Sequence, residues 1–176
     1  SEIAAGNGGA KRGGKRPPEA NPRSRTSPAE PAEPSERNAP SFGFQLATLA
    51  DAVPEGPEWI HEIKLDGYRM QGWSRGGASG LTTRNGKDYT DRFPAIAAEL
   101  ARLGAGETVL DGEVVLEEES GRTSFQLLQN AMSSGSADRA TFFVFDLLTV
   151  RGEDLRPLPL VERKKRLGSL LSGKRL

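Results

Sequence analysis

The sequence contains no cysteine and a single histidine, His61. The lack of cysteine excludes a disulfide framework and a thiolate metal site, and it fits a reducing compartment. One histidine provides too little material for Ser–His catalysis or a histidine metal centre, so we expect His61 to have a structural role on a strand face. These absences direct the search for chemistry to lysine, arginine and the carboxylates.

The chain also lacks net charge and long apolar runs. Its 24 Lys and Arg residues balance 24 Asp and Glu residues, so a charged partner must be inferred from local charge. No apolar stretch approaches the roughly 18 residues of a membrane span, and the N-terminus lacks the apolar core of a signal peptide. We therefore expect a cytoplasmic protein with no membrane partner. The first residue is Ser1 rather than Met, which suggests a piece of a longer polypeptide.

Residues 1–40 are rich in glycine and proline, and Ile3 is their only large apolar residue. Such a segment cannot bury enough apolar surface to offset the entropy of folding. We predict a disordered tail or interdomain linker over residues 1–40 and a folded domain over residues 41–176. The basic pairs Lys11-Arg12 and Lys15-Arg16 leave a second interpretation open, in which the tail attracts nucleic acid.

Apolar patterns and turn residues from Ser41 onward predict strands mixed with isolated helices. The clearest helix has Pro94 in its first turn and Gly104 as its stop. Because most strands are joined by short turns, the expected fold class is α+β, with antiparallel sheets and flanking helices. The expected strands cover residues 59–65, 68–73, 81–84, 107–116 and 141–148, and the expected helices cover residues 91–104, 124–132 and 159–171.

One stretch, residues 62–69 with the sequence EIKLDGYR, concentrates chemistry after an apolar run. On an extended segment Lys64 and Asp66 point to the same face. Gly67 allows a turn or a close approach of the backbone to a ligand, and Arg69 offers a planar fork of donors that suits phosphate. The stretch therefore indicates a nucleophile beside a phosphate clamp, although a surface strand with a salt bridge is the plain alternative.

Two further stretches carry charge at strand ends. Residues 83–88 combine a tight Asn-Gly turn with Arg84, which can contact phosphate or a sugar, or can simply form a hairpin. Asp111 and Glu113 flank a glycine inside an apolar strand. Carboxylates in such a setting need a metal, a hydroxyl or a cation as partner, and a bulge with a salt bridge is the alternative.

The apolar strand over residues 142–148 contains three phenylalanines and one acid. Regular alternation predicts Phe142 and Asp146 on one face and Phe143 and Phe145 on the other. An aromatic wall for a purine is one interpretation, and core packing is the commoner use of such residues.

In this order, the motifs resemble the adenylation domain of ATP-dependent DNA ligases, within the covalent nucleotidyltransferase superfamily. The likeness extends over roughly residues 41–171 and is greatest to the ligase module of bacterial LigD-type end-joining proteins. It implies an ATP-grasp-like nucleotidyltransferase domain. The stretches that carry the resemblance are WIHEIKLDGYR (59–69), TRNG (83–86), LDGE (110–113), FQLLQN (125–130) and FVFDLL (143–148).

The resemblance implies a role for each candidate site residue. Lys64 is expected to form a covalent bond with AMP and Asp66 to orient the nucleophile loop, with Arg69 as a third catalytic residue. Glu113 is expected to contact the ribose or a metal, Mg²⁺ or Mn²⁺. The expected nucleotide-binding residues are Glu62, Ile63, Lys64, Arg69, Arg84, Glu113 and Phe142, with Glu62 near the adenine amine and Phe142 stacked on the base.

The resemblance also implies partners and an incomplete domain. ATP is the expected cofactor and nicked or broken duplex DNA the expected substrate, with a Ku-like end-binding protein and attached end-processing domains as partners and a bacterial, nucleoid-associated location. The later glutamate-glycine and lysine-rich motifs of the family are not found, so we expect the N-terminal part of an adenylation domain. The alternatives are an RNA ligase, a capping-type nucleotidyltransferase, or a non-catalytic piece that binds DNA or protein.

Overall fold

The computed structural model describes Pro40 and residues 42–172. The tail predicted over residues 1–40 therefore lies outside the described residues, except for Pro40. All described residues belong to the second of two units into which the chain divides, Ala32–Leu176.

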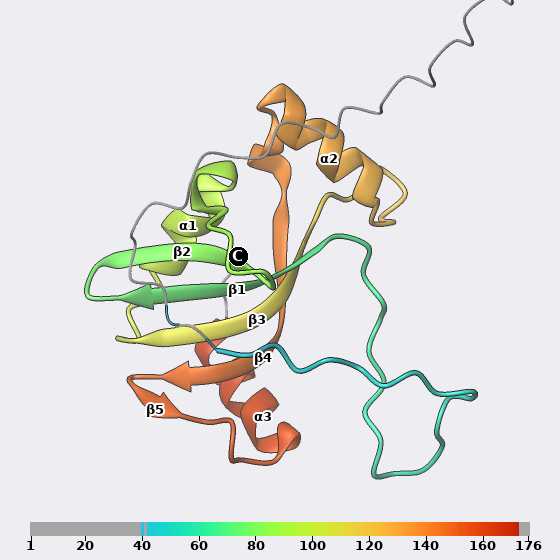
Figure 1. The fold of residues 1–176 in the computed structure, drawn as a ribbon. Coiled ribbons are helices and arrows are strands. Elements are labelled where there is room, and N and C mark those ends of the chain that lie inside the picture. Colours follow the sequence, from blue (N-terminus) through green and yellow to red (C-terminus); the bar gives the residue numbers. More distant parts are fainter. Residues whose placement is uncertain (1–39, 41, 173–176) are drawn as a thin grey trace, which may run out of the picture. The chain divides into compact units, whose positions relative to one another are not determined.

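Five antiparallel strands form one sheet in the order β2-β1-β3-β4-β5 (Figure 1). Two of its hairpins turn over two residues that both have positive φ, as the right-handed twist of the strands requires. These are Gly76 and Gly77 at 55° and 86°, and Arg151 and Gly152 at 53° and 80°. The strands are β1 (Tyr68–Arg75), β2 (Ala78–Thr83), β3 (Thr108–Val115), β4 (Thr141–Val150) and β5 (Glu153–Asp154).

Three α-helices flank the sheet, and two of them begin at sequence signals. Pro94 occupies the first turn of α1, where its missing N–H is not needed. The Ser124 hydroxyl caps α2 by accepting from Leu127 N at 3.3 Å, and Gly135 ends the helix with a left-handed φ of 72°. The helices are α1 (Pro94–Ala101), α2 (Phe125–Ser134) and α3 (Leu160–Leu171), with short 3₁₀ turns at η1 (Thr90–Arg92) and η2 (Ala137–Arg139).

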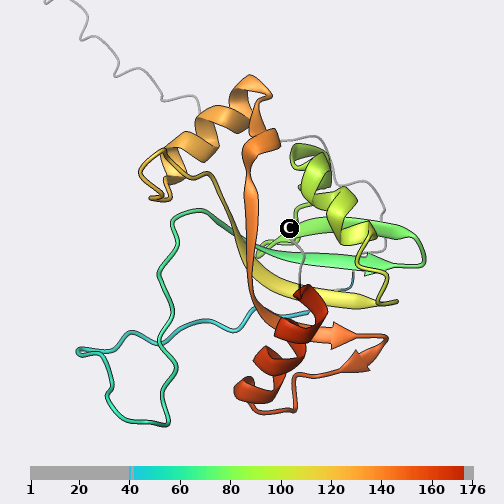
Figure 2. The ribbon, with the colours of Figure 1, turned by 180° about the vertical axis from the view of Figure 1, so that it is seen from behind.

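The main hydrophobic core lies on the sheet face that α1 and α3 cover (Figure 2). Leu100 of α1 and Leu167 of α3 both pack into this core. The predicted apolar stripe of the first helix, Phe93, Ile96, Leu100 and Leu103, is buried as expected. A smaller cluster contains Trp73, Val109 and Leu148, with Phe42 packed against it.

The strand predicted over residues 59–65 is wrong, because the structure gives these residues no regular secondary structure and begins β1 at Tyr68. Trp59 and Ile63 are 51% and 87% exposed. Within the described part of the chain no strand pairs with this stretch, so its apolar residues have no sheet to join. The other predicted strands and all three helices are confirmed, with ends shifted by a few residues.

Candidate active site

A pocket of about 740 Å³ lies over the sheet face that carries Arg69, Asp111 and Asp146. Its walls come from residues 43–47 and 62–65, from strands β1, β3 and β4, and from the start of α3. The lining includes five of the predicted site residues: Glu62, Ile63, Lys64, Arg69 and Glu113.

Lys64 reaches this pocket from a segment outside the sheet. Its side chain is exposed, and the structure shows no hydrogen bond or ion pair for the ammonium among residues 42–172. The charge on Lys64 acts on the Glu113 carboxylate, which lies within electrostatic range. Lys64 therefore lines the pocket with a side-chain nitrogen that has no hydrogen-bond or ion-pair partner in residues 42–172. The other lysine and arginine side chains that line the pocket form ion pairs.

Asp66 does not line the pocket but anchors the segment that carries Lys64. Its backbone N–H donates to Thr123 Oγ1 at 3.0 Å, and its carboxylate accepts from Phe125 N at 3.1 Å, at the start of α2. The next residue, Gly67, lies so close to β3 that an added Cβ would meet the Val114 carbonyl oxygen at 2.1 Å. Only glycine fits there, and the two residues together fix the end of the Lys64 segment.

Arg69 presents its guanidinium to the pocket from β1 and pairs with Asp111 of β3 through two hydrogen bonds of 3.1 and 2.9 Å. The same group lies 5.5 and 5.4 Å from the ring centroids of Phe44 and Phe145, within the range of cation–π attraction. The hydrogen bonds that Arg69 donates to the Asp111 carboxylate raise the pKa of Arg69. Arg69 is thus held in place, with 30% of its side chain still exposed.

Two carboxylates on β3 are partly removed from water. Burial raises the pKa of Glu113, against the opposing effect of a hydrogen bond from the Gly67 backbone N–H and of the charges on Arg69 and Lys64. Burial likewise raises the pKa of Asp111, although its hydrogen bonds to Arg69 act in the opposite direction. A desolvated carboxylate gains from a cation, so Glu113 is the acid of this site that a positive ligand would stabilise.

Phe142 lies in the hydrophobic core and does not line the pocket. Its ring covers Gly72 and Gly112, where an added Cβ would meet it at 2.6 Å. The predicted placement of Phe142 and Asp146 on one face is wrong, because β4 pairs Phe142 with Val114 but Asp146 with Asp111. A register shift between Asp111 and Gly112 inserts an extra residue, Phe145, and reverses the alternation.

Because of this bulge, the aromatic residue that lines the pocket is Phe145. Sequence reasoning placed Phe145 and Asp146 on opposite faces, whereas both line the same pocket. The bulge depends on pairing with β3, so alternation along β4 alone gives no signal for it.

Arg84 lies outside the pocket lining, on the exposed turn that follows β2. The last pair of the antiparallel β1–β2 ladder joins Met70 to Thr83. Arg84 comes one residue after Thr83, and Arg69 comes one residue before Met70. The two arginines therefore stand at the same end of neighbouring strands, and only Arg69 faces the pocket.

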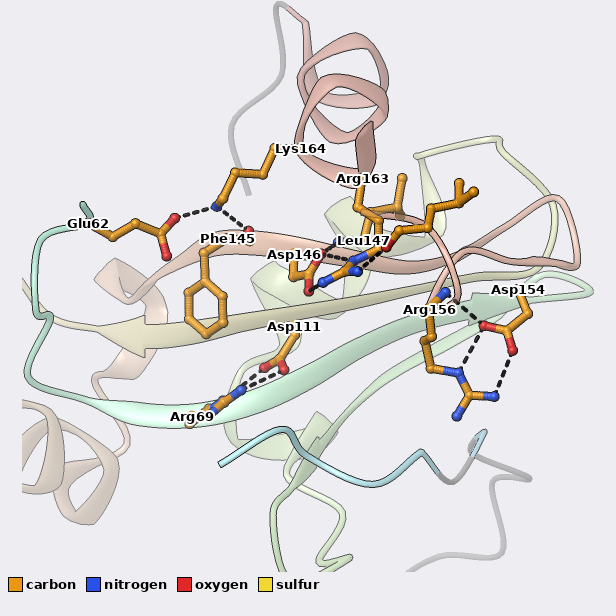
Figure 3. A network of polar contacts seen from close by, with 11 residues as sticks. Glu62, Arg69, Asp111, Phe145, Asp146, Leu147, Asp154, Arg156, Arg163 and Lys164 are labelled. Carbon is orange, nitrogen blue, oxygen red and sulfur yellow. Dashed lines mark hydrogen bonds and ion pairs between the residues drawn. The ribbon is translucent and has the colours of Figure 1, made fainter. Parts of the chain in front are cut away.

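The charged residues of the pocket that were not predicted as site residues include Asp146, Arg163 and Lys164 (Figure 3). Asp146 accepts two hydrogen bonds of 2.9 Å from Arg163, which also donates to the Leu158 carbonyl at 2.6 Å. Lys164 forms an ion pair with Glu62 and donates to the Phe145 carbonyl at 2.7 Å. An acid inside an apolar strand was the sequence signal that could have identified Asp146. Its partner Arg163 lies 17 residues away on α3, so no local pattern links the two.

Among residues 40 and 42–172, no cluster of three or more histidine or acidic residues could enclose a metal ion by itself. The pocket offers Glu113 and the Arg69-bound Asp111 instead. No helix within the same residues is both long and apolar enough to span a membrane.

The chain belongs to the family of ATP-dependent DNA ligase domains. The sequence profile described as "ATP dependent DNA ligase domain" matches residues 45–175. This is an enzyme family, and the match confirms the family predicted from the motifs.

Within that family, similar proteins include end-joining ligases of the LigD type. The chain is 45% identical over 130 residues to the multifunctional non-homologous end joining protein LigD of Pseudomonas aeruginosa, covering 74% of the chain and 15% of that protein. It is 33% identical over 143 residues to the bifunctional LigD of Bacillus subtilis, covering 73% and 23%. The chain therefore spans less than a quarter of the length of these two relatives.

Solved structures agree with this relationship. The ligase domain of Mycobacterium tuberculosis LigD superimposes with a TM-score of 0.58 at 36% identity, over 64% of this chain and 36% of that one. A mycobacterial DNA ligase D complexed with ATP and MES gives a TM-score of 0.57 at 35% identity, over 65% and 36%. The predicted mixed α and β fold with an antiparallel sheet is confirmed.

Proposed function

We propose that the pocket binds ATP and that Lys64 becomes covalently adenylated, as the first step of DNA end joining. The observation that carries this proposal is the free Lys64 amine at a pocket that also contains Arg69, an aromatic ring and two desolvated carboxylates. The family membership and the ATP complex of a mycobacterial relative support ATP as the nucleotide.

In the proposed reaction, the unprotonated Nζ of Lys64 attacks the α-phosphorus of ATP. An N–P bond forms, the P–O bond to the β-phosphate breaks, and the bonding pair leaves with pyrophosphate while Nζ loses its proton. Arg69 is suited to the charge that develops on the phosphate oxygens, because its guanidinium is permanently protonated and held in a fixed orientation by Asp111. Asp66 acts by orientation, through its hydrogen bond to the start of α2.

The remaining pocket residues fit the base and the sugar. Phe145, rather than Phe142, offers an aromatic ring at the pocket, and Glu62 offers an acceptor for the adenine amine. Ile63 adds apolar contact beside them. Arg84, at the end of β2 next to Arg69, is proposed to contact the phosphate of ATP or of the DNA end.

A divalent cation, Mg²⁺ or Mn²⁺, fits the donor set around Glu113. Mg²⁺ usually binds one or two protein carboxylates together with substrate phosphates, so the lack of a protein cage in the described residues is no obstacle. Glu113 would hold it, since burial raises the pKa of this carboxylate and a cation would relieve the cost of its ionisation. The metal would supply charge neutralisation at the phosphates.

We further propose that AMP then passes from Lys64 to a 5′-phosphorylated end of nicked or broken duplex DNA, where a neighbouring 3′-hydroxyl displaces it. The names of the LigD relatives support end joining as the setting. A Ku-like end-binding protein, attached end-processing domains and a cytoplasmic, nucleoid-associated location belong to the same proposal.

The test is covalent labelling with α-labelled ATP and Mg²⁺. Four proteins are compared after denaturation. Two are the natural gene product that carries this sequence and the 176-residue chain by itself, and the other two are their Lys64→Ala variants. We expect label on the natural product and none on its Lys64→Ala variant, with an acid-labile bond. Label on the 176-residue chain would show that these residues suffice. Label retained by Lys64→Ala, or none on the natural product, would contradict the proposal.

A further inference from the structure

Lys164 connects α3 to two other segments that line the pocket (Figure 3). Its ammonium forms an ion pair with the Glu62 carboxylate, which belongs to the segment that carries Lys64. The same ammonium donates to the backbone carbonyl of Phe145 on β4, at 2.7 Å. One side chain thus fixes the acid of the Lys64 segment relative to the aromatic residue of β4.

The backbone that carries Lys164 is itself held firmly. The neighbouring Arg163 donates two hydrogen bonds of 2.9 Å to Asp146 and one of 2.6 Å to the Leu158 carbonyl. Arg163 and Asp146 are both buried, with side chains 10% and 13% exposed. Lys164 therefore extends from a fixed helix start, whereas Glu62 lies on a segment outside the sheet that needs an external tether.

The ion pair also determines which oxygen of Glu62 is available. Lys164 engages Oε1, and Oε2 accepts no hydrogen bond within the described part of the chain. An unpaired carboxylate oxygen beside an aromatic ring can accept from an amino group on a purine. It would repel the carbonyl oxygen that guanine has at the same position.

We propose that Lys164 is a positioning residue that orients Glu62 and thereby sets the preference of the pocket for ATP over GTP. The inference rests on the proposed adenylation of Lys64 and adds a residue 102 positions from Glu62 in the sequence. Lys164 touches neither the reacting phosphorus nor the base; it acts through the Glu62 carboxylate and the Phe145 carbonyl.

The experiment measures lysyl-nucleotide formation against ATP and GTP concentration in the natural gene product. Lys164→Ala should raise the KM for ATP about ten-fold, the cost expected for losing a well-placed hydrogen bond to a charged acceptor. The rate at saturating ATP should change little, and the ATP-to-GTP ratio of kcat/KM should fall by a similar factor. Lys164→Arg should restore most of both, because it keeps the charge and the donors.

Lys165→Ala is the matched control. Lys165 is the next residue of α3, carries the same charge and is exposed, so its removal should leave both constants unchanged. Melting temperature is the second readout. The Lys164 and Glu62 side chains are 22% and 49% exposed, and ion pairs open to solvent contribute at most about 1 kcal/mol, so Lys164→Ala should melt only slightly below the unaltered protein.

A double-mutant cycle with Glu62→Gln tests whether the two residues act together. If Lys164 works through Glu62, its replacement by alanine should change the KM for ATP much less in the Glu62→Gln background than in the unaltered protein. Equal effects in both backgrounds would mean that Lys164 acts by another route, which would overturn the inference.

The outcomes separate this inference from the proposed function. Unchanged nucleotide preference in Lys164→Ala, while Lys64→Ala abolishes labelling, would overturn the role of Lys164 alone. A lower melting temperature with equal losses for ATP and GTP would show a merely structural role and would overturn it too. A protein that takes no label from either nucleotide would overturn both.

Discussion

The two faces of strand β4 have different roles, although both are built from the same ten residues of chain. One face carries Phe142 and Leu147, which are 3% and 0% exposed in the core under α1 and α3. The other carries Phe145 and Asp146, which line the pocket. One β-bulge, rather than residue type, therefore decides which phenylalanine packs the core and which lines the pocket.

The comparison also separates stability from function. Residues on the core face should affect folding when changed and should affect nucleotide binding only through folding. Changes to exposed side chains on the pocket face should weaken nucleotide binding with little effect on folding. Changes to side chains on that face that are buried in ion pairs should affect both folding and nucleotide binding.

Phe142→Ala should have the largest effect on stability. Removing a fully packed ring leaves a cavity over Gly72 and Gly112, and we expect a loss of about 3–5 kcal/mol in the free energy of unfolding. Phe145→Ala is the matched change on the other face and should cost about 1 kcal/mol or less, mostly its cation–π contact with Arg69. Denaturant titration measures both. A larger loss for Phe145→Ala would reverse the assignment of the two faces.

ATP binding should distinguish the same two phenylalanines in the opposite order. Phe145→Ala should weaken ATP binding by about ten-fold or more, the effect of removing a stacking ring, at a temperature where the variant is folded. Phe142→Ala should bind ATP normally in its folded fraction. Weak binding by folded Phe142→Ala would favour the original prediction that Phe142 stacks on adenine.

Asp146→Ala should have the next largest effect. The change leaves the Arg163 guanidinium, 10% exposed, without its carboxylate, and we expect a loss of about 3 kcal/mol in unfolding free energy. Asp154→Ala is the control, because it removes an equally bidentate but exposed partner of Arg156 and should cost little. Thermal melts of both variants check the difference, and equal shifts would contradict it.

Sequence patterns predicted most of the fold because its signals are local. Pro94, Ser124 and the apolar stripe of α1 lie within one or two turns of the elements that they define. The bulge in β4 and the missing strand over residues 59–65 depend instead on which strands pair, and that is a property of distant segments.

The candidate site divides in the same way. Lys64, Arg69 and Glu113 were predicted from short motifs, and the structure brings all three to one pocket. The Glu62–Lys164 pair was not predicted, because its members lie 102 residues apart and neither stands in a recognisable motif with the other. Phe142 was expected to stack on adenine from the family resemblance, whereas the register shift in β4 brings Phe145 to the pocket.

Gly67→Ala should have an intermediate effect and tests the anchoring of the Lys64 segment. An added methyl group would meet the Val114 carbonyl at 2.1 Å, so the segment must shift away from β3. We expect a loss of about 1–3 kcal/mol in stability and a strong fall in labelling of Lys64. Gly168→Ala in α3 meets nothing within 4 Å and should stabilise the protein by about 0.5–1 kcal/mol. Unimpaired labelling of Gly67→Ala would show that the anchor is not needed.

Glu113→Gln should have the smallest effect on folding, and its sign depends on pH. Because burial raises the pKa of Glu113, the folded state binds its proton more tightly than the unfolded state does. The contribution to stability is fully present below the unfolded pKa and is lost as the pH rises through the folded value. Glutamine has no ionisation to penalise, so Glu113→Gln should melt above the unaltered protein near pH 8, with the gap closing toward pH 4. Labelling of Lys64 should fall at every pH, because glutamine holds a cation poorly. We therefore infer that ionised Glu113 is needed for function but costs folding stability. A variant that melts lower near pH 8 would show instead that the ionised carboxylate stabilises this face of the sheet, and would contradict that inference.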